Sequence, residues 1–154
     1  MKYLANSLPQ VLVLWGEQFD GEMAVMFLTQ LRQAKVRVKL VGLRGKSTAG
    51  LYGISLLPEM TLSQALPIAK FVSSIVIPCH SPHLVSMGND PRIRDFFNEA
   101  DNNQVQFVVG RVREEEVKQF MTPAHVISCL AETEVAEAVQ LVIDQLSENT
   151  SRKG

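Results

Sequence analysis

Short segments rich in apolar residues recur along the chain, and helix-like segments separate them. In order, they are 10–15 (QVLVLW), 36–43 (VRVKLVGL), 71–78 (FVSSIVIP), 105–110 (VQFVVG) and 125–130 (HVISCL). Apolar runs of this length, bounded by Gly and Pro, are typical of strands that are buried in a parallel sheet. Because parallel neighbours need a crossover, the β-helix-β order predicts right-handed connections. We therefore expect an α/β fold, a three-layer α/β/α sandwich with a flavodoxin-like, mostly parallel sheet.

The segments between these runs carry helix signals. Asp20 and Asp90 are candidate N-caps, and Pro91 takes the first helical position after Asp90. The predicted buried faces are Met23, Phe27, Leu31 and Ala34 in the first helix, and Ile93, Phe96, Phe97 and Ala100 in the second. The predicted face of a last helix consists of Val135, Val139, Val142, Ile143 and Leu146. After that helix, we expect 147–154 to be a frayed, flexible tail.

Other segments predict less regular structure. Residues 44–60 are rich in glycine and predict an irregular arm with a short hairpin around 52–56, followed by a brief helical turn that starts at Thr61. We expect a loop over 79–89, and a short exposed helix over 113–121, where Glu114 and Lys118 have helical i,i+4 spacing. With no internal repeat and no linker, residues 1–154 are expected to form a single domain.

Charge and cysteine content narrow the function classes. The formal net charge is -1 and the Lys and Arg residues are scattered, which argues against nucleic-acid binding. No apolar run approaches the length that spans a bilayer, and the N-terminus lacks the apolar core of a secretory signal, so we expect no membrane association. Cys79 and Cys129 each sit beside a strand-like run, a pattern that fits free thiols in a reducing compartment. We therefore expect a cytoplasmic protein.

The loop after the third strand collects Cys79, His80 and His83. In parallel sheets ligands bind at the carboxyl ends of the strands, so an acid from the loop after the first strand, Asp20 or Glu22, would lie at the same edge. A thiol beside an imidazole and a carboxylate is a possible nucleophile. The alternative is a half-buried cysteine with two surface histidines, since free cysteine behaves mostly as a small apolar residue.

Two further kinds of site receive less support. The Cys-His-His spacing matches no usual zinc pattern, so we expect no metal and no cofactor. The segment GLRGKS, Gly42–Ser47, follows a strand but has only two residues between its glycines, whereas a phosphate-binding P-loop needs four before its Gly-Lys-Ser. A solvated turn is the expected structure there.

Three stretches together resemble the DJ/PfpI superfamily, which includes the PfpI intracellular protease and the Parkinson-linked deglycase and has a class I glutamine-amidotransferase-like fold. They are VLVLWGEQFDGEMAVMFLTQLRQAKVRVKLVGLRG, GISLLPEMTLSQAL and FVSSIVIPCHSPHLVSMGNDPRIRDFFNEADNNQVQFVVG. The resemblance covers roughly residues 10 to 110. It implies a cysteine on a tight strand-to-helix turn, usually followed by His and Gly, with an acid partner in the loop after the first strand. It also implies a homodimer.

The chain departs from this family at the functional positions. Aligned without gaps, the family's nucleophile falls on Val109, its histidine on Gly110 and its acid on Met23, one residue from Glu22. The Gly-Gly pair that shapes the family's oxyanion pocket corresponds to the dipeptide at 79–80. The family's long segment after the nucleophile is reduced to 111–124. The resemblance therefore implies the fold, while these departures argue against the family's mechanism.

Three functional hypotheses follow. The first is a catalytically degenerate DJ/PfpI-like domain that acts by binding or self-association, with a small-molecule pocket at the strand ends lined by Trp15, Glu17, Cys79 and His80. The second is a cysteine-dependent hydrolase or glyoxalase-type enzyme whose nucleophile has moved to Cys79, with His80 or His83 as base and Glu22 or Asp20 orienting that base. The third is a redox or metal sensor that uses Cys79, His80 and His83.

Overall fold

The protein folds around a six-stranded sheet in which every described strand pair is parallel. The computed structural model describes residues 10–44, 48–101, 104–117 and 125–153. The strands are β1 (Gln10–Trp15), β2 (Val38–Gly42), β3 (Met60–Thr61), β4 (Val72–Pro78), β5 (Gln106–Gly110) and β6 (His125–Cys129), in the order β3-β2-β1-β4-β5-β6. The five predicted strands are confirmed, and β3 is an additional edge strand. Its two residues are too few to give a recognisable sequence pattern.

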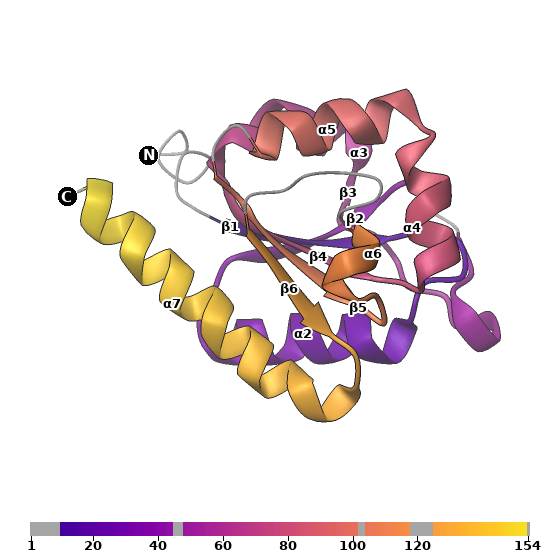
Figure 1. Cartoon of the computed structure of the whole chain (residues 1–154), viewed down its shortest axis with the longest axis horizontal. Helices are drawn as coiled ribbons and strands as arrows, with labels where there is room; N and C mark the ends of the chain where they lie inside the picture. The colour runs from indigo at the N-terminus through magenta and orange to yellow at the C-terminus, as the bar shows by residue number, and fades with distance from the viewer. Residues whose placement is uncertain (1–9, 45–47, 102–103, 118–124, 154) are drawn as a thin grey trace.

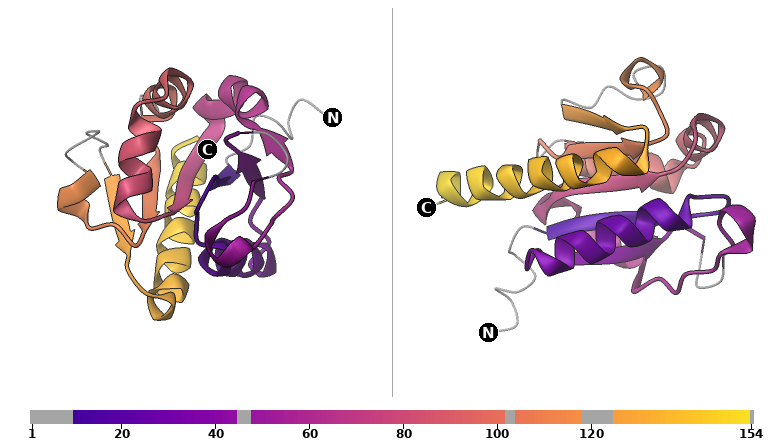
Figure 2. Two further views of the ribbon diagram at one scale, coloured as in Figure 1. Left: turned by 90° about the vertical axis from the view of Figure 1, so that its right-hand side faces the viewer. Right: turned by 90° about the horizontal axis from the view of Figure 1, so that it is seen from below.

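Helices cover both faces of the sheet, which confirms the three-layer α/β/α architecture. Helices α2 (Gly21–Gln33) and α7 (Val135–Lys153) lie below the sheet in Figure 1. Helices α3 (Leu62–Ala65) and α5 (Pro91–Asp101) lie above it, and α4 (Ser81–Gly88) stands at the right-hand end of the view. The short helix α6 (Glu114–Val117) packs beside β6, and the 3-10 turns are η1 (Leu51–Gly53), η2 (Leu66–Phe71) and η3 (Glu132–Glu134). The views in Figure 2 show the same layers from the side and from below. Among the described residues, no helix combines the length and apolarity that crossing a membrane requires.

The central strands are apolar because helices bury both of their faces. All residues of β1 and β4 are buried. The buried hydroxyls of β4 are paired: the Ser73 hydroxyl donates to the carbonyl of Gln10, and that of Ser74 to the side chain of Gln106. Above the sheet, the Phe97 and Phe107 rings pack edge to face at 5.4 Å.

The predicted helix starts are confirmed. The Asp20 carboxylate accepts a hydrogen bond from the backbone N–H of Met23 at 3.0 Å, and the Asp90 carboxylate accepts one from that of Arg92 at 3.0 Å. The Thr61 hydroxyl and the Gln64 side chain form a reciprocal capping box at the start of α3. The predicted apolar faces are buried or packed against the core, except that Ala34 is the exposed C-cap of α2.

Two predicted segments differ from the structure. The expected loop over 79–89 is wrong, because α4 starts after His80 and runs through Gly88. Ser81 and Pro82 occupy the first two positions of α4, where proline loses no hydrogen bond, so a helix start was present in the sequence. The arm around Tyr52 is closed by an antiparallel bridge between Ala49 and Ser55, with η1 in place of a regular hairpin turn.

Two further predictions, for the tail at 147–154 and for the helix at 113–121, extend beyond what the structure tests. Helix α7 continues through Lys153, so most of the predicted tail at 147–154 continues the helix, and its flexibility stays a prediction. Glu114 begins α6, whereas Lys118, its expected i,i+4 partner, lies outside the described residues.

Candidate functional site

The topology brings four loops to the carboxyl edge of the sheet. From β1 the chain crosses to β2 on one side, and β4 pairs with β1 on the other side. A reversal of this kind leaves a crevice outside the strand ends, which is where doubly wound proteins bind ligands. The loops after β1, β2, β4 and β5 all contribute side chains to this edge.

The turn that follows β5 centres on Arg111, which has a left-handed backbone with φ of 66°. A non-glycine residue in this region is strained and persists only where its surroundings hold it. Here the backbone N–H of Arg111 donates to the carbonyl of Cys129 at 3.0 Å. Val109 lies inside β5 and is buried. The tight strand-to-helix turn therefore presents Arg111, two residues beyond the position that a gapless alignment indicates.

The guanidinium of Arg111 has several hydrogen-bond and ion-pair partners. Its Nε donates to the Asp20 carboxylate at 3.2 Å, its Nη1 donates to the carbonyl of Leu130 at 3.1 Å, and its Nη2 pairs with Glu132. The side chains of Arg111 and Asp20 are 24% and 10% exposed, so this pair is partly shielded from water. Burial lowers the pKa of Arg111, but the bonds to Asp20 and Glu132 outweigh it and raise the pKa above its usual value. The cluster joins the loops after β1, β5 and β6.

Cys79 is fully buried at the end of β4. Burial raises the pKa of its thiol from 9.0 to about 12, because the thiolate would lose its hydration. The nucleophilic form of cysteine is the thiolate, so this residue is a protonated core side chain at neutral pH.

The histidines and the acids named from the sequence have separate structural roles. His80 is the N-cap of α4, where its carbonyl accepts from the backbone N–H groups of His83 and Leu84, while Glu22 is exposed in the first turn of α2. Asp20 pairs with Arg111 instead of an imidazole. Within the part of the chain that the structure describes, no three His, Cys, Asp or Glu side chains are placed to hold a metal ion. Cys79 is buried in the core, His80 caps α4 and Asp20 bonds Arg111, so a shared catalytic role for the five candidates Cys79, His80, His83, Glu22 and Asp20 stays a prediction.

The second thiol, Cys129, lies nearer to the turn. It is buried at the end of β6, and its Sγ donates to the carbonyl of Ala131 at 3.6 Å. Burial, and the charge of Glu134 after it, raise the pKa of this thiol from 9.0 to about 11. Its hydrogen-bond partner is a backbone carbonyl, and the raised pKa keeps the thiol protonated at neutral pH.

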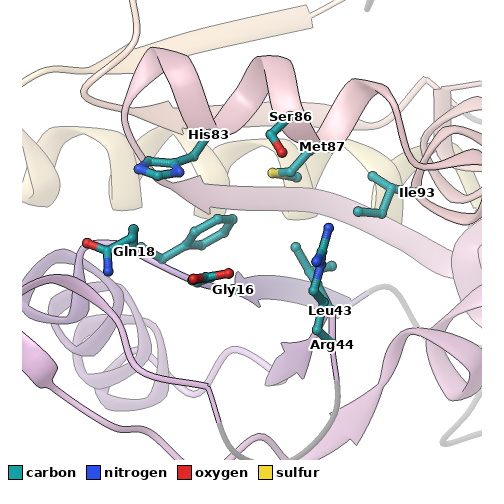
Figure 3. A pocket seen from close by; sticks show the side chains of 10 residues that line it. Gly16, Gln18, Leu43, Arg44, His83, Ser86, Met87 and Ile93 are labelled. Carbon is teal, nitrogen blue, oxygen red and sulfur yellow. The ribbon is translucent and has the colours of Figure 1, made fainter.

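A cavity of about 270 Å³ opens beside β1 at this edge (Figure 3). It is lined by Gly16, Glu17, Gln18, Phe19, Leu43, Arg44, His83, Ser86, Met87 and Ile93. Of the pocket predicted from the sequence, Glu17 is present, whereas Trp15 and Cys79 are buried in the core and His80 does not line the cavity. The residues of α4 were missed as lining groups because 79–89 was expected to be a loop.

The cavity has an apolar floor and a polar rim. Phe19, Leu43, Met87 and Ile93 are buried, whereas Glu17 and Arg44 are exposed. Figure 3 shows His83, Ser86 and Met87 reaching in from α4, with Leu43 and Arg44 on the opposite side. The loop from β1 has a strained residue, Gln18, with φ of 65°, whose backbone N–H donates to the carbonyl of Ala49 at 3.1 Å. Strain of this kind clusters at ligand sites.

Trp15, at the end of β1, connects the arm around Tyr52 to the loop after β1. Its indole Nε1 donates to the carbonyl of Thr48 at 3.1 Å, and the backbone N–H of Leu51 donates to the carbonyl of Phe19 at 2.9 Å. A Cβ at Gly50 would lie 2.4 Å from the Trp15 ring and 2.5 Å from the Phe19 carbonyl oxygen, so only glycine fits there. The arm therefore supports the loop that forms one wall of the cavity.

Comparisons with known proteins place this fold. No family model matches the chain, and no curated protein matches it in sequence. A two-domain protein from Anabaena variabilis with DJ-1/ThiJ/PfpI-like and ferritin-like domains is similar in structure, with a TM-score of 0.71 at 15% identity over 90% of this chain and 48% of the other. The chain thus spans about half the length of that protein.

Two further solved structures match this chain over nearly their whole length. A mutant of a DJ-1 superfamily protein from Salmonella typhimurium has a TM-score of 0.73 at 15% identity, over 93% of this chain and 96% of the other. Drosophila melanogaster DJ-1beta has a TM-score of 0.74 at 12% identity, over 92% and 95%. These similarities, at low identity, concern the architecture. On their evidence, the chain has the fold of the DJ-1/ThiJ/PfpI superfamily.

Proposed function

We propose that this chain is a divergent, catalytically degenerate DJ/PfpI-like domain that binds a small molecule at the carboxyl edge of its sheet in the cytoplasm. The observation that supports the loss of catalysis most directly is Arg111. It occupies the tight turn after β5, where the family resemblance implies a cysteine, and its guanidinium bonds the acid of the β1 loop. A guanidinium stays protonated in proteins and does not act as a nucleophile.

The chemistry of the two thiols supports the same proposal. Cys79 and Cys129 are the only cysteines of the sequence, both are buried, and burial raises the pKa of both. A relocated nucleophile at Cys79 would need a thiolate, and the raised pKa of its buried thiol argues against that alternative. The same burial argues against Cys79 as the ligand of a metal sensor.

Binding is supported by the cavity at the topological switch point. A volume of about 270 Å³ is near the lower end of ligand pockets, which run from about 300 to 1,000 Å³. Its apolar floor and polar rim are the combination typical of small-molecule sites. Self-association as a homodimer, which the resemblance implies, is a separate part of the proposal, and sedimentation velocity over a range of concentrations tests it.

The test combines catalysis with binding. Glyoxalase, deglycase, esterase and peptidase assays of the purified full chain should give no turnover above that of the Cys79→Ser and Cys129→Ser variants. Robust turnover that disappears in Cys79→Ser would overturn the proposal in favour of the relocated nucleophile. In parallel, a small-molecule fragment library screened by protein NMR should perturb signals of Phe19, Met87 or Ile93. A screen without any such perturbation would refute the binding role.

A further inference from the structure

The cavity presents two opposite charges that are unpaired within the described structure. Glu17 and Arg44 both line it, and neither has an ion-pair or hydrogen-bond partner for its side chain among the described residues. Elsewhere at the same edge, the charged side chains of Asp20, Arg111 and Glu132 are paired with one another. The cavity therefore holds one free carboxylate and one free guanidinium beside an apolar floor.

We propose that the cavity binds a small zwitterion with an apolar substituent, in chemical terms a free α-amino acid with an apolar side chain. The ligand's carboxylate would pair with Arg44, its ammonium with Glu17, and its side chain would contact Phe19, Met87 and Ile93. A guanidinium favours planar carboxylates because it donates two parallel hydrogen bonds. This inference names the ligand class of the proposed binding function and rests on it.

Charge balance selects this class over others. A ligand that closes the cavity removes water from both rim charges, and a buried charge without a partner is costly. A neutral apolar molecule would leave both charges unpaired. A dicarboxylate would place a negative group beside Glu17, and a diamine a positive group beside Arg44. A zwitterion pairs with both charges at once.

The remaining polar groups fit the same ligand. His83 and Ser86 enter from α4, across the cavity from Arg44 (Figure 3). Hydroxyl and imidazole groups can form hydrogen bonds, so both can bond the ammonium N–H groups or the carboxylate oxygens of an amino acid. A volume of about 270 Å³ can hold a molecule of the size of a single amino acid.

The test uses the full chain and calorimetric titration with leucine, methionine and phenylalanine. Each is compared with its N-acetyl derivative, which lacks the ammonium, and with its amide, which lacks the carboxylate. At least one free amino acid should bind saturably. Each of its two derivatives should bind with an affinity lower by about tenfold or more, because each lacks one charge-assisted contact. Equal affinity for a free amino acid and either of its derivatives would overturn the proposal.

Paired variants locate the two contacts. Glu17→Gln should lower the affinity for the free amino acid about tenfold and leave the affinity for the N-acetyl derivative unchanged. Arg44→Gln should lower the affinity for the free amino acid and leave the affinity for the amide unchanged. The matched controls are Glu137→Gln and Arg94→Gln, which alter exposed residues on α7 and α5 and should bind like the unmodified chain. Loss of binding that is equal in all four variants would contradict these assignments.

The two levels of the proposal fail in different ways. If no free amino acid binds but a ligand of another class perturbs the NMR signals of Phe19 or Ile93, the proposed ligand class is wrong and the proposed binding function stands. If nothing binds in the cavity at all, both are wrong.

Discussion

The Nε of Arg111 donates to the Asp20 carboxylate at 3.2 Å, although 91 residues of sequence separate the two. The same carboxylate accepts the backbone N–H of Met23 at 3.0 Å and so caps α2. One side chain thus both starts a helix and anchors the turn after β5. Asp20 therefore stabilises the fold both as a helix cap and as the ion-pair partner of Arg111.

Asp20→Asn and Asp20→Ala separate these two roles. Asparagine is a good N-cap, so Asp20→Asn removes only the charge on the pair with Arg111, and it should lower the free energy of unfolding by about 1–2 kcal/mol. Asp20→Ala should cost about 1 kcal/mol more, because the cap is also lost. Urea denaturation measures both values. Equal losses in the two variants would mean that the cap contributes nothing.

Cys79 should react very slowly with alkylating reagents. A pKa of about 12 against 9.0 for an ordinary thiol lowers the thiolate fraction by about a thousandfold near neutral pH, before any effect of steric burial. Iodoacetamide labelling followed by mass spectrometry of the Cys79 peptide tests this, with urea-unfolded protein as the fast reference. Labelling of the native protein at the rate of a free thiol would show that Cys79 is accessible and would reopen the nucleophile hypothesis.

Stability should fall in alkaline solution, partly because of Cys79. Its pKa is raised in the folded state, so the unfolded chain loses the thiol proton first, and the stabilisation is complete below pH 9 and is lost as pH rises toward 12. Within that window, one such group contributes a slope of up to about 1.4 kcal/mol per pH unit. Cys79→Ala should therefore show a shallower decline in the free energy of unfolding between pH 9 and 11 than the unmodified chain. Parallel curves for the two proteins would contradict the predicted shift.

Gly50→Ala should disturb the cavity wall. The added Cβ would meet the rigid Trp15 ring at 2.4 Å and a backbone oxygen of Phe19 at 2.5 Å, neither of which can move without shifting the β1 loop. We expect a loss of about 2–3 kcal/mol in unfolding free energy and NMR shift changes at Glu17–Phe19. Gly53→Ala is the matched control: it has φ of 73° but no atom within 4 Å, so backbone strain alone should cost about 1 kcal/mol.

The sequence predicted the sheet well because its strands are buried on both faces. Such strands consist of apolar residues, as in β1 and β4, and the pattern survives without knowledge of tertiary contacts. Helices α2 and α5 were predicted because a side chain, Asp20 or Asp90, marks each start. Edge strand β3 and helix α4 were missed. Strand β3 is very short, and α4 begins with Ser81 and Pro82 after His80, residue types that also favour turns.

The site was less predictable because it depends on contacts between distant loops. Nothing in the local sequence marks Arg111 as the residue of the tight turn, since a left-handed backbone there would favour glycine. The pairing of Asp20 with Arg111, and the burial of Cys79, both depend on the order β1-β4-β5 in the sheet. Glu17 alone among the expected pocket residues lines the cavity, because it lies in the loop that follows β1.

The central position of β1 has a consequence for synthesis on the ribosome. Gln10 contacts Ser73, a partner 63 residues further along the chain, and β1 lies between β2 and β4. The whole first half of the polypeptide, through the end of β4 at Pro78, must therefore leave the exit tunnel before this strand gains both neighbours. Until then an apolar edge is open to other nascent chains, so early protection by a chaperone should raise the yield of native protein.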